Sequence, residues 1–277
     1  MSTSRSRWPQ HEGSHSSFGI ANAQLIERGV ASLIEAFRRV ARLSERGAIE
    51  EHDHVITIAT GVPVPSFNPT FVMRPPRDPD RAFRRVRDFY TRLGFAGEVT
   101  AWGDTALAIV DAATRAALVA GHRIPCLLQA PLGVTVPTAP DLEIRRVDDA
   151  AALLRFNDVC AEAFGLERQA IAIFDDPRLL AMSGSTPHVG LVDGVPVATA
   201  WSYCIDGVVL LFNVATLASH RRRGIGEAMT WRAIQDGLER GCDVAFLQAS
   251  RAGRPLYERM GFRPAVDMQT WSLPPSP

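Results

Sequence analysis

Apolar residues recur at every third or fourth position along several stretches of the chain, which is the spacing of one face of an α-helix. The first of these stretches is the longest, and it ends at Gly47, a residue type that commonly terminates helices. A later apolar stripe begins at Ile225 and is closed by Gly241. The pattern predicts helices over residues 20–46, 80–93, 106–120, 148–164, 166–174, 225–240 and 254–260.

Short apolar runs bounded by turn residues alternate with these helices and predict strands. Asp193-Gly194 separates two such runs, and an Asp-Gly pair in this position is typical of a β-hairpin. The chain is therefore expected to be a mixed α/β protein. The predicted strands cover residues 55–59, 70–73, 125–131, 142–147, 188–192, 195–203, 208–214, 243–249 and 265–273.

The segment Gly133–Asp141 contains two prolines and has the composition of a stiff linker. It predicts a boundary between an N-terminal α/β domain at residues 18–135 and a second domain at residues 141–277. Residues 1–17 are rich in Ser, Arg and His without an apolar core segment. We expect them to form a disordered tail and not a secretory signal.

The composition argues against several classes of binding partner. Thirty basic residues balance thirty acidic ones, so the net charge indicates neither nucleic acid nor an anionic membrane. No apolar run of about eighteen residues predicts a membrane span. His52 and His54 flank an aspartate, but neighbours in a strand point to opposite faces and no third ligand is nearby, so no metal site is predicted.

The cysteines have no Cys-x-x-Cys spacing, and each lies in an apolar stretch. They predict buried free thiols in a reducing cytoplasm, although their number also permits one disulfide. They are Cys126, Cys160, Cys204 and Cys242.

The segment His220–Ala228 lies between a predicted strand and a predicted helix and contains three arginines and two glycines. Free N–H groups in a first helical turn attract phosphate, and glycine lets the backbone approach a ligand closely. A Walker loop is excluded because the chain has no lysine, and a dinucleotide fingerprint would need a third glycine where Met229 stands. The ligand predicted for this loop is a pyrophosphate.

Two motifs in order, Arg-x-x-Gly-x-Gly at residues 221–226 and Tyr-x-x-x-Gly-Phe at residues 257–262, resemble those of the GCN5-related N-acetyltransferase (GNAT) superfamily. The resemblance covers about residues 141–273 and implies a GNAT fold, an α/β (α+β) fold with a mixed, mostly antiparallel sheet flanked by helices. The first half has no such loop. It is interpreted as a smaller, degenerate GNAT-like domain that shapes an acceptor pocket, with an unrelated α/β module as the alternative.

The resemblance implies acetyl-CoA as the cofactor and Tyr257 as the catalytic acid that protonates the departing thiolate. A backbone N–H near Val214 would polarise the thioester oxygen. Ser250 stands where the family commonly has an asparagine. The expected cofactor-binding residues are Val214, Ala215, Thr216, Arg221, Arg222, Arg223, Gly224, Ile225, Gly226, Glu227, Ala228 and Ser250.

No general base is evident, because the strand before the loop carries Asn213 where an acidic residue would be the first choice. His188, Asp206 or a residue of the first half remain open for that role. Trp201, Tyr203 and Phe212 are candidates for an acceptor pocket, with core packing as the alternative for each. The simplest interpretation of His220 is a structural or solvent-facing residue without a role in the chemistry.

The predicted function is acetyl-CoA dependent transfer of an acetyl group to the amine of a small molecule or peptide. A non-catalytic acyl-CoA binding or sensing protein and an acyltransferase with a longer acyl-CoA donor are the alternatives. Dimers are common in the family, so a homodimer is compatible with the resemblance.

Overall fold

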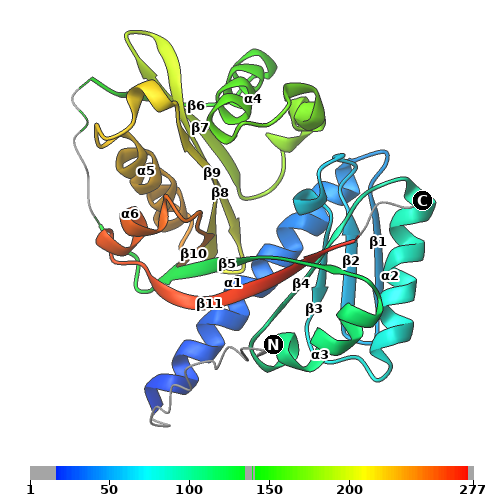
Figure 1. Ribbon diagram of the computed structural model, residues 1–277. Coiled ribbons are helices and arrows are strands. Elements are labelled where there is room, and N and C mark those ends of the chain that lie inside the picture. The colour runs from blue at the N-terminus through cyan, green and yellow to red at the C-terminus, as the bar shows by residue number, and fades with distance from the viewer. Residues whose placement is uncertain (1–16, 135–138, 140, 274–277) are drawn as a thin grey trace, which may run out of the picture.

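A single open sheet runs through both halves of the chain in the computed structural model, which describes residues 17–134, 139 and 141–273 (Figure 1). Its eleven strands are β1 (Ala48–His52), β2 (Val55–Ala59), β3 (Pro69–Val72), β4 (Glu98–Trp102), β5 (Val119–Gln129), β6 (Glu143–Arg146), β7 (Ser185–Val192), β8 (Val195–Ile205), β9 (Val208–Thr216), β10 (Val244–Gln248) and β11 (Arg263–Ser272).

Helices flank this sheet, and short 3-10 segments lie in its connections. The α-helices are α1 (Ser17–Leu43), α2 (Pro79–Leu93), α3 (Gly103–Arg115), α4 (Ala150–Phe164), α5 (Ile225–Glu239) and α6 (Arg254–Arg259). The 3-10 segments are η1 (Pro65–Phe67), η2 (Arg168–Asp175), η3 (Pro177–Leu179) and η4 (Ala218–His220). The predicted mixed α/β class is confirmed.

The two halves exchange their last strands at the centre of the sheet. The strand order is β1-β2-β3-β4-β11-β5-β10-β9-β8-β7-β6, so β11 lies between β4 and β5, while β5 lies between β11 and β10. Both strands are long and span the two halves in Figure 1. Each half therefore completes its part of the sheet with a strand from the other half.

The order of elements around this centre occurs twice along the chain. β3 and β4 are parallel and connected through α2, and β9 and β10 are parallel and connected through α5. In each half a shorter second helix and a long strand follow, α3 with β5 and α6 with β11. All other strand pairs are antiparallel. The repeat favours the GNAT-like interpretation of the first half, while the domain limits 18–135 and 141–277 remain a prediction.

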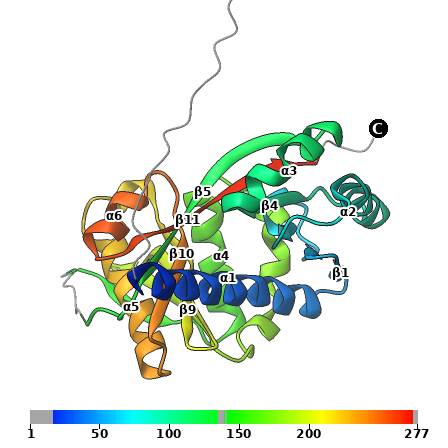
Figure 2. The same cartoon turned by 90° about the horizontal axis from the view of Figure 1, so that it is seen from below.

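Helix α1 packs across both halves of the sheet, against β8, β9 and β10 on one side and β1 and β2 on the other (Figures 1 and 2). Its close approach depends on Gly29, because a Cβ there would lie 2.3 Å from the ring of Phe246 on β10. The face of β10 toward α1 carries Val244 and Phe246, and the opposite face carries Ala245 and Leu247. This alternation is that of a strand buried on both faces.

One predicted helix was wrong at its end, and two strands were not predicted. The helix expected over 106–120 ends at Arg115, Ala117 adopts a positive φ of 54°, and β5 begins at Val119. The Ala-rich sequence continues the apolar pattern, but residues 119–129 gain strand partners on β11 and β10. The unpredicted strands are β1 and β4.

Candidate functional site

The loop after β9 turns into α5 without any side-chain cap. Gly224, which precedes the helix, has φ 77°, a conformation that favours glycine, and Arg222 also has a positive φ of 65°. Within the described residues, the consecutive backbone N–H groups from Arg222 to Glu227 donate no hydrogen bond, and the first bonded N–H is that of Ala228, which reaches the Gly224 carbonyl at 3.0 Å. Free donors at a helix start are the arrangement that commonly binds anions.

The three loop arginines have different partners. Arg221 donates from Nε to the Thr216 carbonyl at 3.0 Å and from Nη2 to the Ala163 carbonyl at 3.3 Å, so it ties the loop to β9 and to α4. Arg223 lies 3.4 Å from a carboxylate oxygen of Asp141. Arg222 is exposed and has no hydrogen-bond or ion-pair partner among the described residues. It is the arginine best placed to meet a bound anion.

Strands β9 and β10 separate just before this loop. Their parallel pairing covers three residue pairs and ends at Leu210 and Phe246, although β9 continues to Thr216. On its other edge β9 pairs with β8 through an irregularity opposite Thr199–Trp201, where Asn213 has φ 50°. Beyond this bulge Val214, Ala215 and Thr216 are therefore next to the gap between the strands.

Tyr257 lies on α6, buried in the core beneath α5, with its ring 5.8 Å from that of Phe262. Its hydroxyl has no hydrogen-bond partner within the described part of the chain, and burial raises the pKa of this phenol to about 12. The group therefore stays protonated at neutral pH. Ser250 is exposed, and its hydroxyl accepts the N–H of Gly253, the residue that precedes α6, at 3.0 Å.

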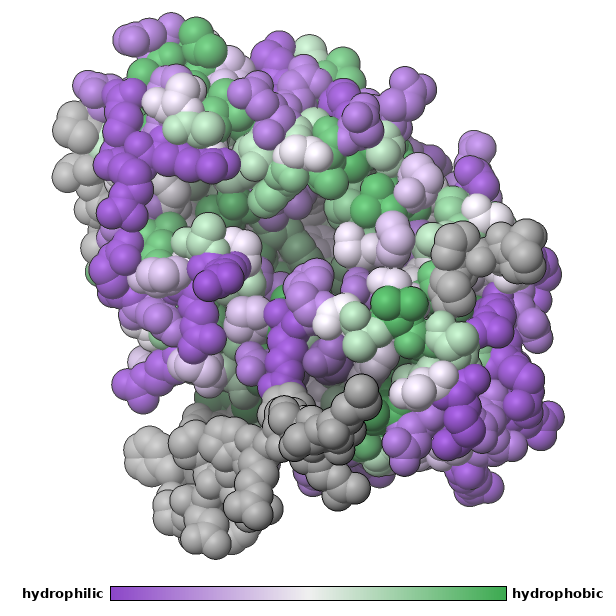
Figure 3. Space-filling model, in the orientation of Figure 1, coloured by the Kyte–Doolittle hydropathy of each residue, from purple (hydrophilic) through white to green (hydrophobic). Residues whose placement is uncertain are grey.

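A hydrophobic cavity lies between the two halves, where Figure 3 shows a hollow with hydrophobic side chains in it. Trp201, Tyr203 and Phe212 all line this cavity, together with Asn213 at the β9 bulge. The N-terminal half contributes from α1, from the residue after β2 and from η1. The lining residues are Ala36, Phe37, Val40, Thr60, Phe67, Phe174, Leu179, Met182, Ser185, Trp201, Tyr203, Phe212 and Asn213.

Sequence reasoning missed the lining residues from α1, η1 and η2. Phe67 on η1 and Phe174 on η2 stack across the two halves with ring centres 5.1 Å apart. Phe37 belongs to the apolar stripe of α1, which predicts burial but not a ligand. Only the tertiary arrangement shows that these stripes face a cavity.

The two residues named as alternative bases lie elsewhere. Asp206 is in the β8–β9 turn, which at about 3.3 Å per residue is roughly 20 Å along β9 from Asn213. His188 on β7 is buried, and its Nε2 lies 2.8 Å from Oδ2 of Asp236 on α5. Neither residue lines the hydrophobic cavity.

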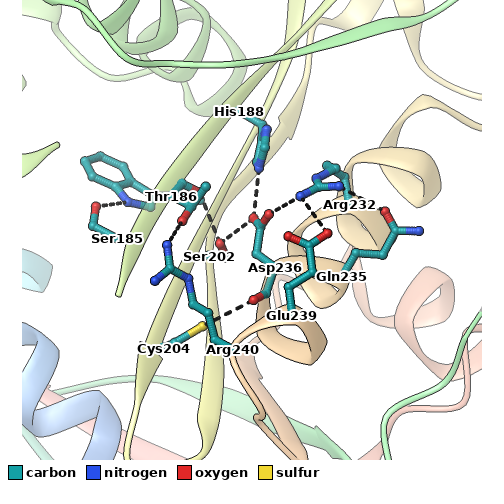
Figure 4. A network of polar contacts seen from close by, with 11 residues as sticks. Ser185, Thr186, His188, Ser202, Cys204, Arg232, Gln235, Asp236, Glu239 and Arg240 are labelled. Carbon is teal, nitrogen blue, oxygen red and sulfur yellow. Dashed lines mark hydrogen bonds and ion pairs between the residues drawn. The ribbon is translucent and has the colours of Figure 1, made fainter. Parts of the chain in front are cut away.

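Asp236 is the centre of a buried polar network between β7, β8 and α5 (Figure 4). Ser202 donates to its Oδ2 at 2.6 Å, and Arg232 donates to its Oδ1. Burial opposes ionisation of this carboxyl, but the hydrogen bonds from His188, Ser202 and Arg232 outweigh that effect and lower its pKa. The network holds an ionised aspartate between the sheet and α5.

No group of three or more metal-ligating side chains gathers anywhere among the described residues. In the part of the chain that the structure describes, no helix is both long and apolar enough to cross a membrane. All four cysteines are free thiols, three of them buried and Cys204 half-buried.

Comparison with known proteins adds a family match to this geometry. Residues 153–262, which include the loop and Tyr257, match the acetyltransferase (GNAT) family. Among curated proteins the comparison finds no significant match.

Several solved structures share the fold over most of the chain. A GCN5-related N-acetyltransferase from Kribbella flavida is 22% identical, with a TM-score of 0.69 over 90% of this chain and 97% of its own. A second, from Sphaerobacter thermophilus, is 16% identical, with a TM-score of 0.57 over 93% of this chain and 94% of its own. A tandem GNAT protein from the clavulanic acid biosynthesis pathway is 12% identical, with a TM-score of 0.56 over 80% of this chain and 79% of its own.

Proposed function

Because the C-terminal half of the chain is a domain of the GNAT superfamily, as its two motifs predicted, we propose that the protein transfers an acetyl group from acetyl-CoA to an amine. The acceptor in this proposal is a small molecule or a peptide. The fold match to the Kribbella flavida protein covers 90% of this chain, which supports a role for the first half as a GNAT-like partner of the second.

The observation that carries this proposal is the uncapped start of α5. The free N–H groups from Arg222 to Glu227 are suited to hold the pyrophosphate of coenzyme A, with Arg222 adding positive charge. Residues 214–216, beside the gap between β9 and β10, are suited to pair with the pantetheine arm as an added strand. In this proposal the Val214 N–H polarises the thioester oxygen.

When bound, acetyl-CoA supplies a thioester carbonyl that the amine attacks, so that a C–N bond forms, the C–S bond breaks and the nitrogen loses one proton. Tyr257 then provides a proton for the leaving sulfur, because its raised pKa keeps the phenol protonated and its hydroxyl has no competing partner among the described residues. The loop amides contribute by position and charge alone.

The proposal is tested by calorimetric titration of the purified protein with acetyl-CoA, followed by a thiol-release assay over a panel of amines. We expect saturable binding and turnover with some of the amines. Absence of acetyl-CoA binding would contradict the proposal. Binding without turnover over the whole panel would favour a non-catalytic acyl-CoA sensor, and tighter binding of longer acyl-CoA donors would favour a different donor.

A further inference from the structure

The hydrophobic cavity between the halves has an unusual lining for a site that receives an amine. Six of its side chains are aromatic, and the polar ones are Thr60, Ser185 and Asn213 in addition to the Tyr203 phenol. Among the described residues, no carboxylate, histidine or arginine lines it. Polyamines and amino sugars carry several charges that would have no partner there.

The charged groups around the cavity are already paired with one another. On α1, Glu35 accepts hydrogen bonds at 3.1 Å from both Arg39 and Arg42. On η2, Asp175 accepts from Arg168 at 2.7 Å. The Asp176 carboxylate beside η3 is likewise bonded to Arg178 at 2.8 Å. None of these carboxylates is free to stabilise an ammonium ion inside the cavity.

Arg39 lies beside the cavity wall and is paired with Glu35. Its guanidinium carbon lies 5.7 Å from the ring centre of Tyr203, and burial raises the pKa of that phenol, so it stays neutral. The Tyr203 hydroxyl is buried and has no hydrogen-bond partner among the described residues. A neutral donor or acceptor on a ligand would satisfy it, whereas an ammonium ion would find no free carboxylate there.

The cavity also abuts the proposed reaction centre. Phe212 and Asn213 belong to its lining and immediately precede residues 214–216, the segment proposed to run beside the donor. A ligand in the cavity would therefore present its end group at the β9 bulge. The Phe67–Phe174 contact places both halves around that ligand.

We propose that the acceptor is an apolar primary amine, carrying an aromatic ring or a branched hydrocarbon, and that it enters this cavity uncharged. This inference rests on the proposed function. It accounts for the missing general base. The ammonium proton is lost to bulk water before the amine binds, and the second proton, which the nitrogen loses after the C–N bond forms, replaces the one that Tyr257 gives to the leaving sulfur.

The test compares phenethylamine, benzylamine and ring- or side-chain-fluorinated analogues with spermidine, an amino sugar and glycine as acceptors. We expect kcat/KM for the aromatic amines to exceed that for the polar ones by at least about 100-fold. Log kcat/KM should rise with pH and level off at each amine's own solution pKa, moving as fluorination moves that pKa. An inflection that stays fixed for all amines would indicate a protein base and overturn the proposal.

Two variants test whether the preference for aromatic amines arises in the cavity. Phe174→Leu, a conservative change in its wall, should raise KM for phenethylamine about tenfold and leave the acetyl-CoA Kd unchanged. The control is Phe164→Leu, since Phe164 is 48% exposed on α4 and does not line the cavity. An unchanged KM in Phe174→Leu, or a preference for polar amines while acetyl-CoA still binds, would overturn this inference alone.

The other ligand group that would fit this cavity is the acyl chain of a longer acyl-CoA donor. Octanoyl-CoA should bind no more tightly than acetyl-CoA, and phenethylamine should be the ligand that depends on Phe174. If octanoyl-CoA binds more tightly and Phe174→Leu removes that gain, the cavity holds an acyl chain and the acceptor assignment is wrong. Failure of the native protein to bind either donor would instead reject the proposed function itself.

Discussion

Gly224 and Asp78 occupy the same position in the two strand–helix–strand units, immediately before α5 and α2, but only Asp78 caps its helix with a side chain. The Asp78 carboxylate accepts the N–H of Arg81 at 2.9 Å, and it brings negative charge to the start of α2. Gly224 leaves the start of α5 open. The proposed pyrophosphate site therefore has no counterpart at the start of α2, although both halves have a helix at the corresponding place.

Gly226→Ala should weaken acetyl-CoA binding while the fold persists. A Cβ at this position would stand 3.5 Å from Leu256 and 3.6 Å from Thr216, ordinary contact distances, in the gap between β9 and α6. We expect the Kd to rise at least about tenfold, equivalent to about 1.4 kcal/mol. Calorimetric titration with acetyl-CoA measures this Kd.

The control is Asp78→Ala, which removes the cap of α2 and should cost about 1 kcal/mol of unfolding free energy with an unchanged Kd. If Gly226→Ala binds acetyl-CoA as the native chain does, the loop is not the pyrophosphate site.

Tyr257→Phe should lower kcat about 10²- to 10⁴-fold with little change in the acetyl-CoA Kd, because it removes only a proton donor. Steady-state kinetics with calorimetry separates the two effects. Tyr90→Phe is the matched control: the Tyr90 hydroxyl is fully buried and donates to the Asn68 carbonyl at 2.7 Å in the first half. That change should lower stability without lowering kcat, and an undiminished kcat in Tyr257→Phe would remove the acid role.

Arg222→Gly should separate charge from backbone conformation in the loop. Glycine adopts the positive φ of this position more readily than arginine, so stability should not fall. Acetyl-CoA affinity should fall, and it should depend less on ionic strength because one screened attraction is lost. Titrations at low and high salt measure both. An equal salt dependence in variant and native protein would show that Arg222 does not meet the phosphates.

Asp236→Asn should lower the free energy of unfolding by about 3 kcal/mol at neutral pH, since it leaves Arg232 without its buried partner. The lowered pKa of Asp236 means that this stabilisation is present above the ordinary aspartate pKa of about 4 and is lost as pH falls through the lower folded-state value. Urea unfolding at several pH values measures the difference between variant and native protein.

Asp243→Asn is the control for Asp236→Asn, because the Asp243–Arg28 pair is exposed and should contribute less than about 1 kcal/mol. A stability loss in Asp236→Asn no larger than in this control would show that the network in Figure 4 is dispensable.

Sequence was most informative where a local pattern decides the structure. The apolar stripe from Ile225 to Gly241 and the hairpin at Asp193-Gly194 were predicted as they occur, because each depends on neighbours in the chain. The start of β5 was not predicted, since Val119 becomes strand by pairing with Ser272 at the other end of the sequence.

The same distinction between local and long-range signals applies to the candidate site. Its loop and Tyr257 lie in short motifs that can be recognised from sequence. The cavity could not be predicted, because Phe37, Phe67 and Phe174 each look like ordinary core residues and meet only in the folded chain. The role expected for Ser250 stays a prediction, and its hydroxyl is already bonded to Gly253.

The exchange of β5 and β11 also sets the order in which the chain can fold during synthesis. The first half is synthesised with a vacant position between β4 and β5, and β11, which follows much later in the chain, fills it. The sheet of the first half is therefore incomplete until β11 has been made. A chaperone that shields the open edge of β4 during that interval would meet the need this topology creates.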